Sequence, residues 1–316
     1  MNYGEIISEA FRLTWRNRFL WFFGFFVGGS GAFFNIPNGV SNLRGPGGTS
    51  GASGAQIGRF ISDNTGLIVA LAVLLVVVLV LVGIFLWLIS QGALVDSVAA
   101  LHRGEERRFS SAFRAGLSNF WRVLGFVILI SLISLVLALL TFLIAALPIV
   151  GVFAATHSSG ARIATIILVV LLAIGVFIVV FIPLSIIWQL ALRALVVNHG
   201  GVFSSLRSGS GLFRQRLGQS LLVWLIGIAL ALGAGFALLI VALIVGLILA
   251  IPAAALFFAD LRIAGIVVGV VAAVVFLILF VIASAAIGTF NHAYWTLAYL
   301  RLATPIDRGP PQPAPD

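Results

Sequence analysis

The polar side chains best suited to chemistry lie near the ends of alternate apolar segments. Asp96 and Arg193 close two long apolar runs, and Asn291 and His292 close a third. Ionisable groups at membrane depth are candidates for a gate or a head-group site, because burying charge in hydrocarbon is costly. The alternative is structural, either an Asp96–Arg193 ion pair or solvated helix ends. With two glutamines at matching positions, the candidate cluster at the cytoplasmic mouth comprises Gln91, Asp96, Gln189, Arg193, Asn291 and His292.

No pattern typical of catalysis or metal binding accompanies these side chains. The chain has no Cys, and its four His do not follow a metal-ligand spacing. The zinc-protease pattern HExxH, the esterase pattern GxSxG and paired aspartates within an apolar segment are missing from the sequence. We therefore expect no enzymatic activity, no cofactor and no bound metal.

The elements that must position the cluster are membrane-spanning helices. Hydrophobic residues make up 62% of the 316 residues and charged residues 9%, whereas about 25% of the residues in soluble domains are charged. Most apolar segments exceed the ~20 residues that a span needs, and the first is short. The predicted fold class is an all-α integral membrane protein, a bundle of six spans. The segments are 19–34, 66–95, 123–152, 163–192, 217–258 and 263–290.

The arginines predict the orientation and the surroundings. All 18 basic residues are Arg, and only Arg44, Arg59, Arg162 and Arg262 fall on the side opposite the termini. This asymmetry places both termini in the cytoplasm, in a multi-pass protein of the cytoplasmic (inner) membrane. Because the arginines flank apolar runs, the net charge of +9 indicates membrane lipids, including anionic lipids, as partners and not nucleic acid. Candidate head-group contacts are Arg12, Arg114, Arg122, Arg207 and Arg214.

Short amphipathic stretches precede the first, third and fifth spans. Each has an apolar face opposite a polar one, which is typical of a helix lying in the membrane interface. Large apolar residues contribute to each predicted face, for example Phe11, Phe109 and Phe203. The second and fourth spans also end alike, with Gln91 matching Gln189. The chain therefore reads as three tandem repeats, each an interfacial helix followed by one span out and one span back.

These repeats define the predicted domain organisation. A single transmembrane domain covers residues 1–303, with repeats at about 1–104, 105–200 and 201–303. A Gly-rich outer loop at 35–64 and a Pro-rich tail at 304–316 are predicted to be disordered. Pro148, Pro183 and Pro252 are predicted to break the long helices, because proline removes one backbone hydrogen bond.

The junction between the first two repeats resembles a known family. Its matching residues are Gly92-Ala93-Leu94, Phe109, Ala112, Gly116, Phe120-Trp121-Arg122 and Leu124-Gly125. This pattern is similar to the membrane domain attached to some glycerophosphoryl diester phosphodiesterases and to related bacterial and archaeal families of unknown function. The resemblance implies a six-span membrane unit and no catalytic residues. The catalytic domain of that family is not expected here, because no polar segment approaches the length of a domain.

Two functions remain open at this point. The first is a non-enzymatic structural, assembly or regulatory protein that packs against another membrane protein or a second copy of itself. The second is the handling or transport of a lipid or amphiphile through a central cavity. A solid Leu/Val/Ala centre favours the first function, and an interior cavity lined by hydroxyl groups such as Ser284 favours the second.

Overall fold

The fold is helical throughout the residues that can be described. The computed structural model describes residues 2–28, 65–155 and 158–303, of which 92% are helical and none lies in a strand. In chain order the helices are α1 (Tyr3–Arg16), α2 (Leu20–Gly28), α5 (Thr65–His102), α6 (Phe109–Ser118), α7 (Phe120–Ala155), α8 (Ser159–Val176), the π-helix η2 (Phe177–Phe181), α9 (Ile182–Val197), α10 (Val202–Gln215), α11 (Leu217–Phe258) and α12 (Arg262–Ala303).

Five helices among these residues are long and apolar enough to cross a membrane. They are α5, α7, the continuous α8–η2–α9, α11 and α12. The first segment expected from the sequence is represented by α2, which has nine residues. The rest of that segment lies outside the described residues, as do the predicted loop at 35–64 and tail at 304–316. The sixth span therefore stays a prediction.

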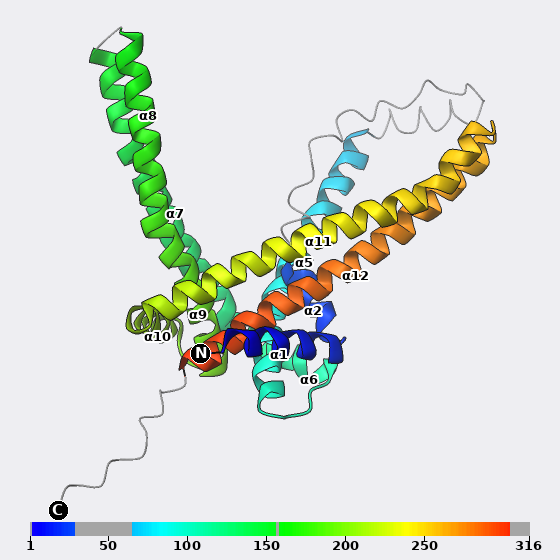
Figure 1. The fold of residues 1–316 in the computed structure, drawn as a ribbon, viewed down its shortest axis with the longest axis horizontal. Coiled ribbons are helices and arrows are strands. Elements are labelled where there is room, and N and C mark those ends of the chain that lie inside the picture. The colour runs from blue at the N-terminus through cyan, green and yellow to red at the C-terminus, as the bar shows by residue number, and fades with distance from the viewer. Residues whose placement is uncertain (1, 29–64, 156–157, 304–316) are drawn as a thin grey trace, which may run out of the picture.

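The long helices meet at one end and diverge at the other (Figure 1). Buried side chains concentrate in residues 88–100 of α5, 186–196 of α9 and 285–302 of α12, which we call the packed end. At the other end, the α7–α8 pair and the α11–α12 pair point in different directions and expose apolar side chains along their length. We call these two pairs the arms.

The lengths of the helices explain this division. At 1.5 Å per residue, the 38 residues of α5 span roughly 57 Å, whereas the hydrocarbon core of a bilayer is about 30 Å thick. Large apolar residues 67–85 of α5 are mostly exposed, and residues 88–100 are buried. A single helix thus provides an apolar stretch long enough to span the bilayer and a separate stretch that builds the packed end.

Each short helix packs on one of the three helices of the packed end. Helix α6 lies against α5, α10 against α9, and α1 against α12. The buried line on α6 is Ala112 and Gly116, and that on α10 includes Ser205 and Gly209. Small residues four apart let the helix axes approach closely, which fixes the short helices on the bundle.

The proline positions differ from the expected breaks. Pro148 lies inside α7 and Pro252 inside α11, and both helices continue beyond the proline. The prediction that the helices break at these two prolines was therefore wrong. Pro183 lies in the first turn of α9, directly after η2. A proline ring clashes with the carbonyl four residues earlier, here Val179, and the wider π-turn occurs at that carbonyl.

Candidate functional site

Arg193 is the most deeply buried ionisable side chain of the packed end. Its side chain is 0% exposed. Nη1 donates to the backbone carbonyl of Gln189 at 2.9 Å and also to Gln189 Oε1. Nη2 lies 3.5 Å from Nδ1 of His292 on α12, and the guanidinium carbon is 6.0 Å from the centre of the Trp295 ring. Arg193 therefore joins α9 to α12 through its partners.

The guanidinium of Arg193 has no carboxylate within ion-pair distance among the described residues, and its Nε has no hydrogen-bond partner there. A buried charge without a counter-ion is costly, because a low-dielectric surrounding cannot replace its hydration. Gln91 on α5 is also buried, with Oε1 unpartnered among the same residues. The packed end thus contains polar groups that are only partly satisfied.

Asp96 is paired with a residue that the sequence did not suggest. Its Oδ2 lies 3.2 Å from Nη2 of Arg107, in the connection between α5 and α6. Both side chains are mostly buried, with 16% and 20% of their surfaces exposed. The alternative of an Asp96–Arg193 ion pair is therefore wrong. Nearby, a hydrogen bond from Arg103 lowers the pKa of Glu105 below its ordinary value, and Arg103 and Arg107 act in the same direction.

A second charged group attaches α1 to the packed end. Glu9 on α1 lies 2.6 Å from Nδ1 of His102, the last residue of α5. Arg301, near the end of α12, is 3.1 Å from Glu5 and 3.7 Å from Glu9. The sequence predicts that one face of this helix is polar, but it does not predict what Glu5 and Glu9 contact. Their partners are about 100 and 300 residues away, so no spacing within α1 could have identified them.

The five arginines expected to contact lipid head groups are all exposed on the short helices or at the start of α7. None of them forms an ion pair with a described residue. An exposed guanidinium without a carboxylate partner is available to an anionic group in the surroundings. These arginines are Arg12, Arg114, Arg122, Arg207 and Arg214.

Close glycine contacts explain how the short helices reach their positions. A Cβ on Gly116 would overlap the carbonyl oxygen of Ile89 and touch the Cβ of Ala93 at 3.0 Å. A Cβ on Gly209 would lie 2.8 Å from both the backbone nitrogen and the Cβ of Ala191. Both sites therefore require a residue without a side chain.

Helix α2 packs on α12 in the same manner, through Gly24 and Gly28, which lie four residues apart on one face of the helix. A Cβ on Gly28 would lie 2.7 Å from the Cα of Gly288, and one on Gly24 would overlap Thr289. The hydroxyl of Thr289 lies 3.1 Å from the carbonyl oxygen of Leu20 and 2.9 Å from that of Ala285. These contacts hold the chain's first apolar helix against its last helix.

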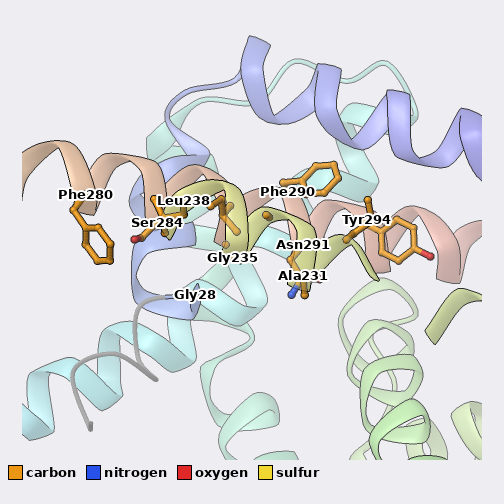
Figure 2. A pocket seen from close by; sticks show the side chains of 13 residues that line it. Gly28, Ala231, Gly235, Leu238, Phe280, Ser284, Phe290, Asn291 and Tyr294 are labelled. Carbon is orange, nitrogen blue, oxygen red and sulfur yellow. The ribbon is translucent and has the colours of Figure 1, made fainter. Parts of the chain in front are cut away.

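A cavity of about 300 Å³ lies beside the packed end, between α2, α11 and α12. Figure 2 shows its side chains, with Ala231, Gly235 and Leu238 on α11 facing Ser284 and Asn291 on α12. Gly28 closes one side. Asn291 thus faces the cavity, whereas its neighbour His292 contacts Arg193. The six residues of the predicted cluster consequently divide into separate environments.

The described residues contain no group of three His, Asp or Glu side chains able to hold a metal ion. What the site offers is a buried cation, a set of ion pairs between helices, exposed arginines and a mainly apolar cavity. Such groups can fix helices to one another and contact lipid. Together with the fold, they define a class: an all-helical protein with several candidate membrane-spanning helices, joined at one end by a packed polar and apolar core.

Comparison with known families gives a more specific assignment. Residues 15–303 match the model of DUF7544, a family of unknown function, so the chain belongs to that family. No curated protein and no solved structure matches the chain. The comparisons give no evidence for the resemblance to glycerophosphoryl diester phosphodiesterases.

Proposed function

We propose that this chain is a non-enzymatic, multi-pass protein of the cytoplasmic membrane that acts as a structural, assembly or regulatory partner of other membrane proteins or of a second copy of itself. The observation that carries the proposal is the state of the glycines on the α7–α8 arm. Gly151 and Gly175 have no heavy atom within 4 Å of the position that a Cβ would occupy. Exposed small residues in a span let another helix approach closely.

The contrast with the packed end strengthens this argument. Gly28, Gly116 and Gly209 are already used for contacts within the chain. Gly151 and Gly175 are not, whereas Gly246 and Gly265 of the α11–α12 arm contact residues of that same arm. The arms also diverge, so that each leaves its long apolar faces uncovered by the other (Figure 1). Lipid can cover these faces, but helices with Gly positions on them are suited to closer packing than lipid provides.

The proposed architecture is six spans in three tandem two-span units, related by an axis along the membrane normal. Support comes from equivalent contacts at two junctions. Gly116 packs on Ala93, and Gly209 packs on Ala191. Each alanine lies two residues after a matching glutamine, Gln91 or Gln189. The third junction would be closed by α1 on α12, which is the arrangement that a ring of three units requires.

The resemblance to the membrane domain of glycerophosphoryl diester phosphodiesterases belongs to the same proposal. Its two halves face each other at the first junction. The Cβ position of Gly92 is 3.5 Å from the Cα of Gly116 and 3.3 Å from the Cβ of Asn119. The pattern therefore acts as a helix-packing motif in this chain, which accords with a structural and not a catalytic likeness.

The short helices α1, α6 and α10 are proposed to lie in the cytoplasmic interface, with both termini in the cytoplasm. Exposed aromatic side chains support this position, since Phe109 is 44% exposed and Phe203 74% exposed. An apolar ring and an unpaired arginine on one short helix suit the boundary between acyl chains and anionic head groups.

The orientation can be tested directly because the chain has no native Cys. Single cysteines are introduced at Ser50 and, separately, at Ser110, and intact cells are treated with a membrane-impermeant thiol reagent. We expect labelling at position 50 and protection at 110 until the cells are opened. Labelling at position 110 alone in intact cells would reverse the proposed orientation.

Partner association is tested by site-specific photocrosslinking in living cells. A photoreactive phenylalanine analogue is placed at Leu139 on α7 or Leu247 on α11, both exposed on the arms. Gly211 on the short helix α10 serves as the control position, because no heavy atom lies within 4 Å of its Cβ position. We expect a discrete protein adduct from at least one arm position and not from the control. Adducts with lipid alone at both arm positions would refute the partner role.

Lipid or amphiphile handling remains the second candidate, and the cavity beside the packed end favours it. A route through the centre is less well supported. Ala93, Leu190 and Ala298, on the three helices that meet there, are each 0% exposed. Any lipid function is therefore better sought at the side of the bundle than along its axis.

A further inference from the structure

The cavity continues beyond the packed end along the seam between α11 and α12. A second, smaller space of about 40 Å³ shares Leu238 and Phe280 with the first and extends to Val245 and Phe276. On α11 the lining of the two spaces runs from Leu230 to Val245, a rise of roughly 23 Å at 1.5 Å per residue. We call this combined feature the seam groove. It is long, narrow and open at its side.

The seam groove is polar at one end and apolar at the other. Asn291 and Ser284 line it where it meets the packed end, and neither side chain forms a hydrogen bond with a described residue. Towards the other end, the lining is formed by residues such as Leu238, Phe276 and Phe280. An amide and a hydroxyl left unpaired beside an apolar surface are unfavourable unless another molecule supplies an acceptor.

The position of the groove limits what can occupy it. Helices α11 and α12 are both candidate membrane spans, and the polar end of the groove lies at the level of the packed end. We infer that the apolar length of the groove lies at membrane depth. The two volumes, about 300 and 40 Å³, are too small to hold a helix, which is about 10 Å wide with its side chains. It lies at the lower limit of the ~300–1,000 Å³ typical of small-molecule pockets.

We propose that the seam groove binds one polar lipid, with a hydrocarbon chain along the α11–α12 seam and the linkage oxygens of the lipid next to Asn291 and Ser284. The amide and hydroxyl donate to ester or ether oxygens at the root of the head group. The head group itself lies outside the groove, at the level of the short helices and their unpaired arginines. This site is independent of partner association through the arms.

Two glycines of α11 provide a matched test. Gly235 lines the groove, whereas Gly233, two residues earlier, does not. Both are exposed, and neither has a heavy atom within 4 Å of its Cβ position. The Cβ of a new side chain therefore meets no atom of the chain at either site, and both Gly→Leu substitutions change helix propensity equally. Only the Gly235→Leu side chain enters the volume assigned to the lipid.

The protein is reconstituted in nanodiscs of phosphatidylglycerol and phosphatidylethanolamine, and the lipids retained after its release are counted by native mass spectrometry. We expect one retained lipid in the natural protein and in Gly233→Leu, and several-fold lower retention in Gly235→Leu. Asn291→Leu preserves the size of the side chain and removes its amide, so it should lower retention while gel filtration shows an unchanged particle. This variant keeps the test decisive if Gly235→Leu does not fold.

The location of the chain is read separately with a phosphatidylglycerol whose acyl chain has a photoreactive diazirine. Adducts on Leu238 and Phe280 that fall in Gly235→Leu and persist in Gly233→Leu support the groove. Equal retention and equal labelling in both glycine variants would show a surrounding bilayer lipid only and overturn the proposal, as would a natural protein that retains no lipid.

Discussion

The strongest test of the packed end is the substitution of two neighbouring glycines on α10. Gly209 faces α9, where a Cβ would lie 2.8 Å from both the nitrogen and the Cβ of Ala191. Gly211 lies in the same helix, and nothing is within 4 Å of its Cβ position. Replacing either residue by alanine removes the same flexibility from the unfolded chain and improves helix propensity by about 1 kcal/mol. The difference between the variants therefore isolates the clash.

Overpacking of a well-packed contact costs typically ~1–3 kcal/mol. The gain in helix propensity is the same in both variants and cancels when they are compared. Gly209→Ala should therefore be less stable than Gly211→Ala by about 1–3 kcal/mol, the cost of the clash. Gly211→Ala itself should equal or exceed the natural protein in stability. The free energy of unfolding is measured by titration with SDS from a mild detergent, with tryptophan fluorescence as the signal. Equal unfolding midpoints for the two alanine variants would show that α10 does not pack on α9 as described.

Three further predictions concern single contacts of the packed end. Asp96→Arg and Arg107→Asp should each lower the free energy of unfolding. The double variant should recover on the order of 1 kcal/mol, because it restores an ion pair with the charges exchanged. Losses that simply add in the double variant would contradict the Asp96–Arg107 pair. Tyr294→Phe should lower the free energy of unfolding by about 1 kcal/mol, because the Tyr294 hydroxyl donates to the Val223 carbonyl at 2.8 Å. An unchanged free energy of unfolding would argue against that hydrogen bond. Arg193→Met should stay within about 1 kcal/mol of the natural protein or exceed it, whereas Arg193→Ala should lose ~2–5 kcal/mol through the cavity it leaves. Equal losses in the Met and Ala variants would show that the charge itself is required.

The sequence was sufficient to locate the helices, because their patterns are local. The short helices were expected from one-sided apolar patterns, and α1, α6 and α10 occupy those stretches. The apolar lengths likewise indicated the five long helices. Their ends were less accurate. The segment expected at 66–95 is part of α5, Thr65–His102, because the packed end extends the helix past the apolar run and through polar residues such as Asp96 and Ser97.

The sequence did not predict which residues of the short helices pack on the bundle, because this depends on tertiary contacts. Phe109 and Phe203, assigned to the apolar faces of interfacial helices, are 44% and 74% exposed and so are not the residues that pack there. The buried line on α6 is formed by Ala112 and Gly116. Hydropathy ranks Phe above Gly, whereas close approach of two helix axes selects the smaller residue. Large apolar residues on an interfacial helix are then free to face lipid.

The candidate site shows the same division between local and long-range information. Gln189 and Arg193 are four residues apart on one helix, so their contact could be expected from spacing alone. The contact with His292 depends on how α9 crosses α12, and the Asp96–Arg107 pair depends on the turn before α6. The cavity depends on three helices at once. No pattern within one helix contains that information.

The proposed threefold arrangement accounts for both the similarities and the differences among the units. Each unit has a fully buried alanine two residues after a polar side chain. The pairs are Gln91 and Ala93, Gln189 and Ala191, and Asn291 and Ala293, and all three alanines are 0% exposed. Helices can thus pack closely at the alanine position of every unit, because a small residue occupies it in all three. The polar residue before it is free to differ, since Asn291 faces the cavity whereas Gln189 binds Arg193. The three units thus share the alanine that packs the helices but differ in the polar residue before it. This difference lets the proposed lipid site occur in one unit only, on one side of the ring.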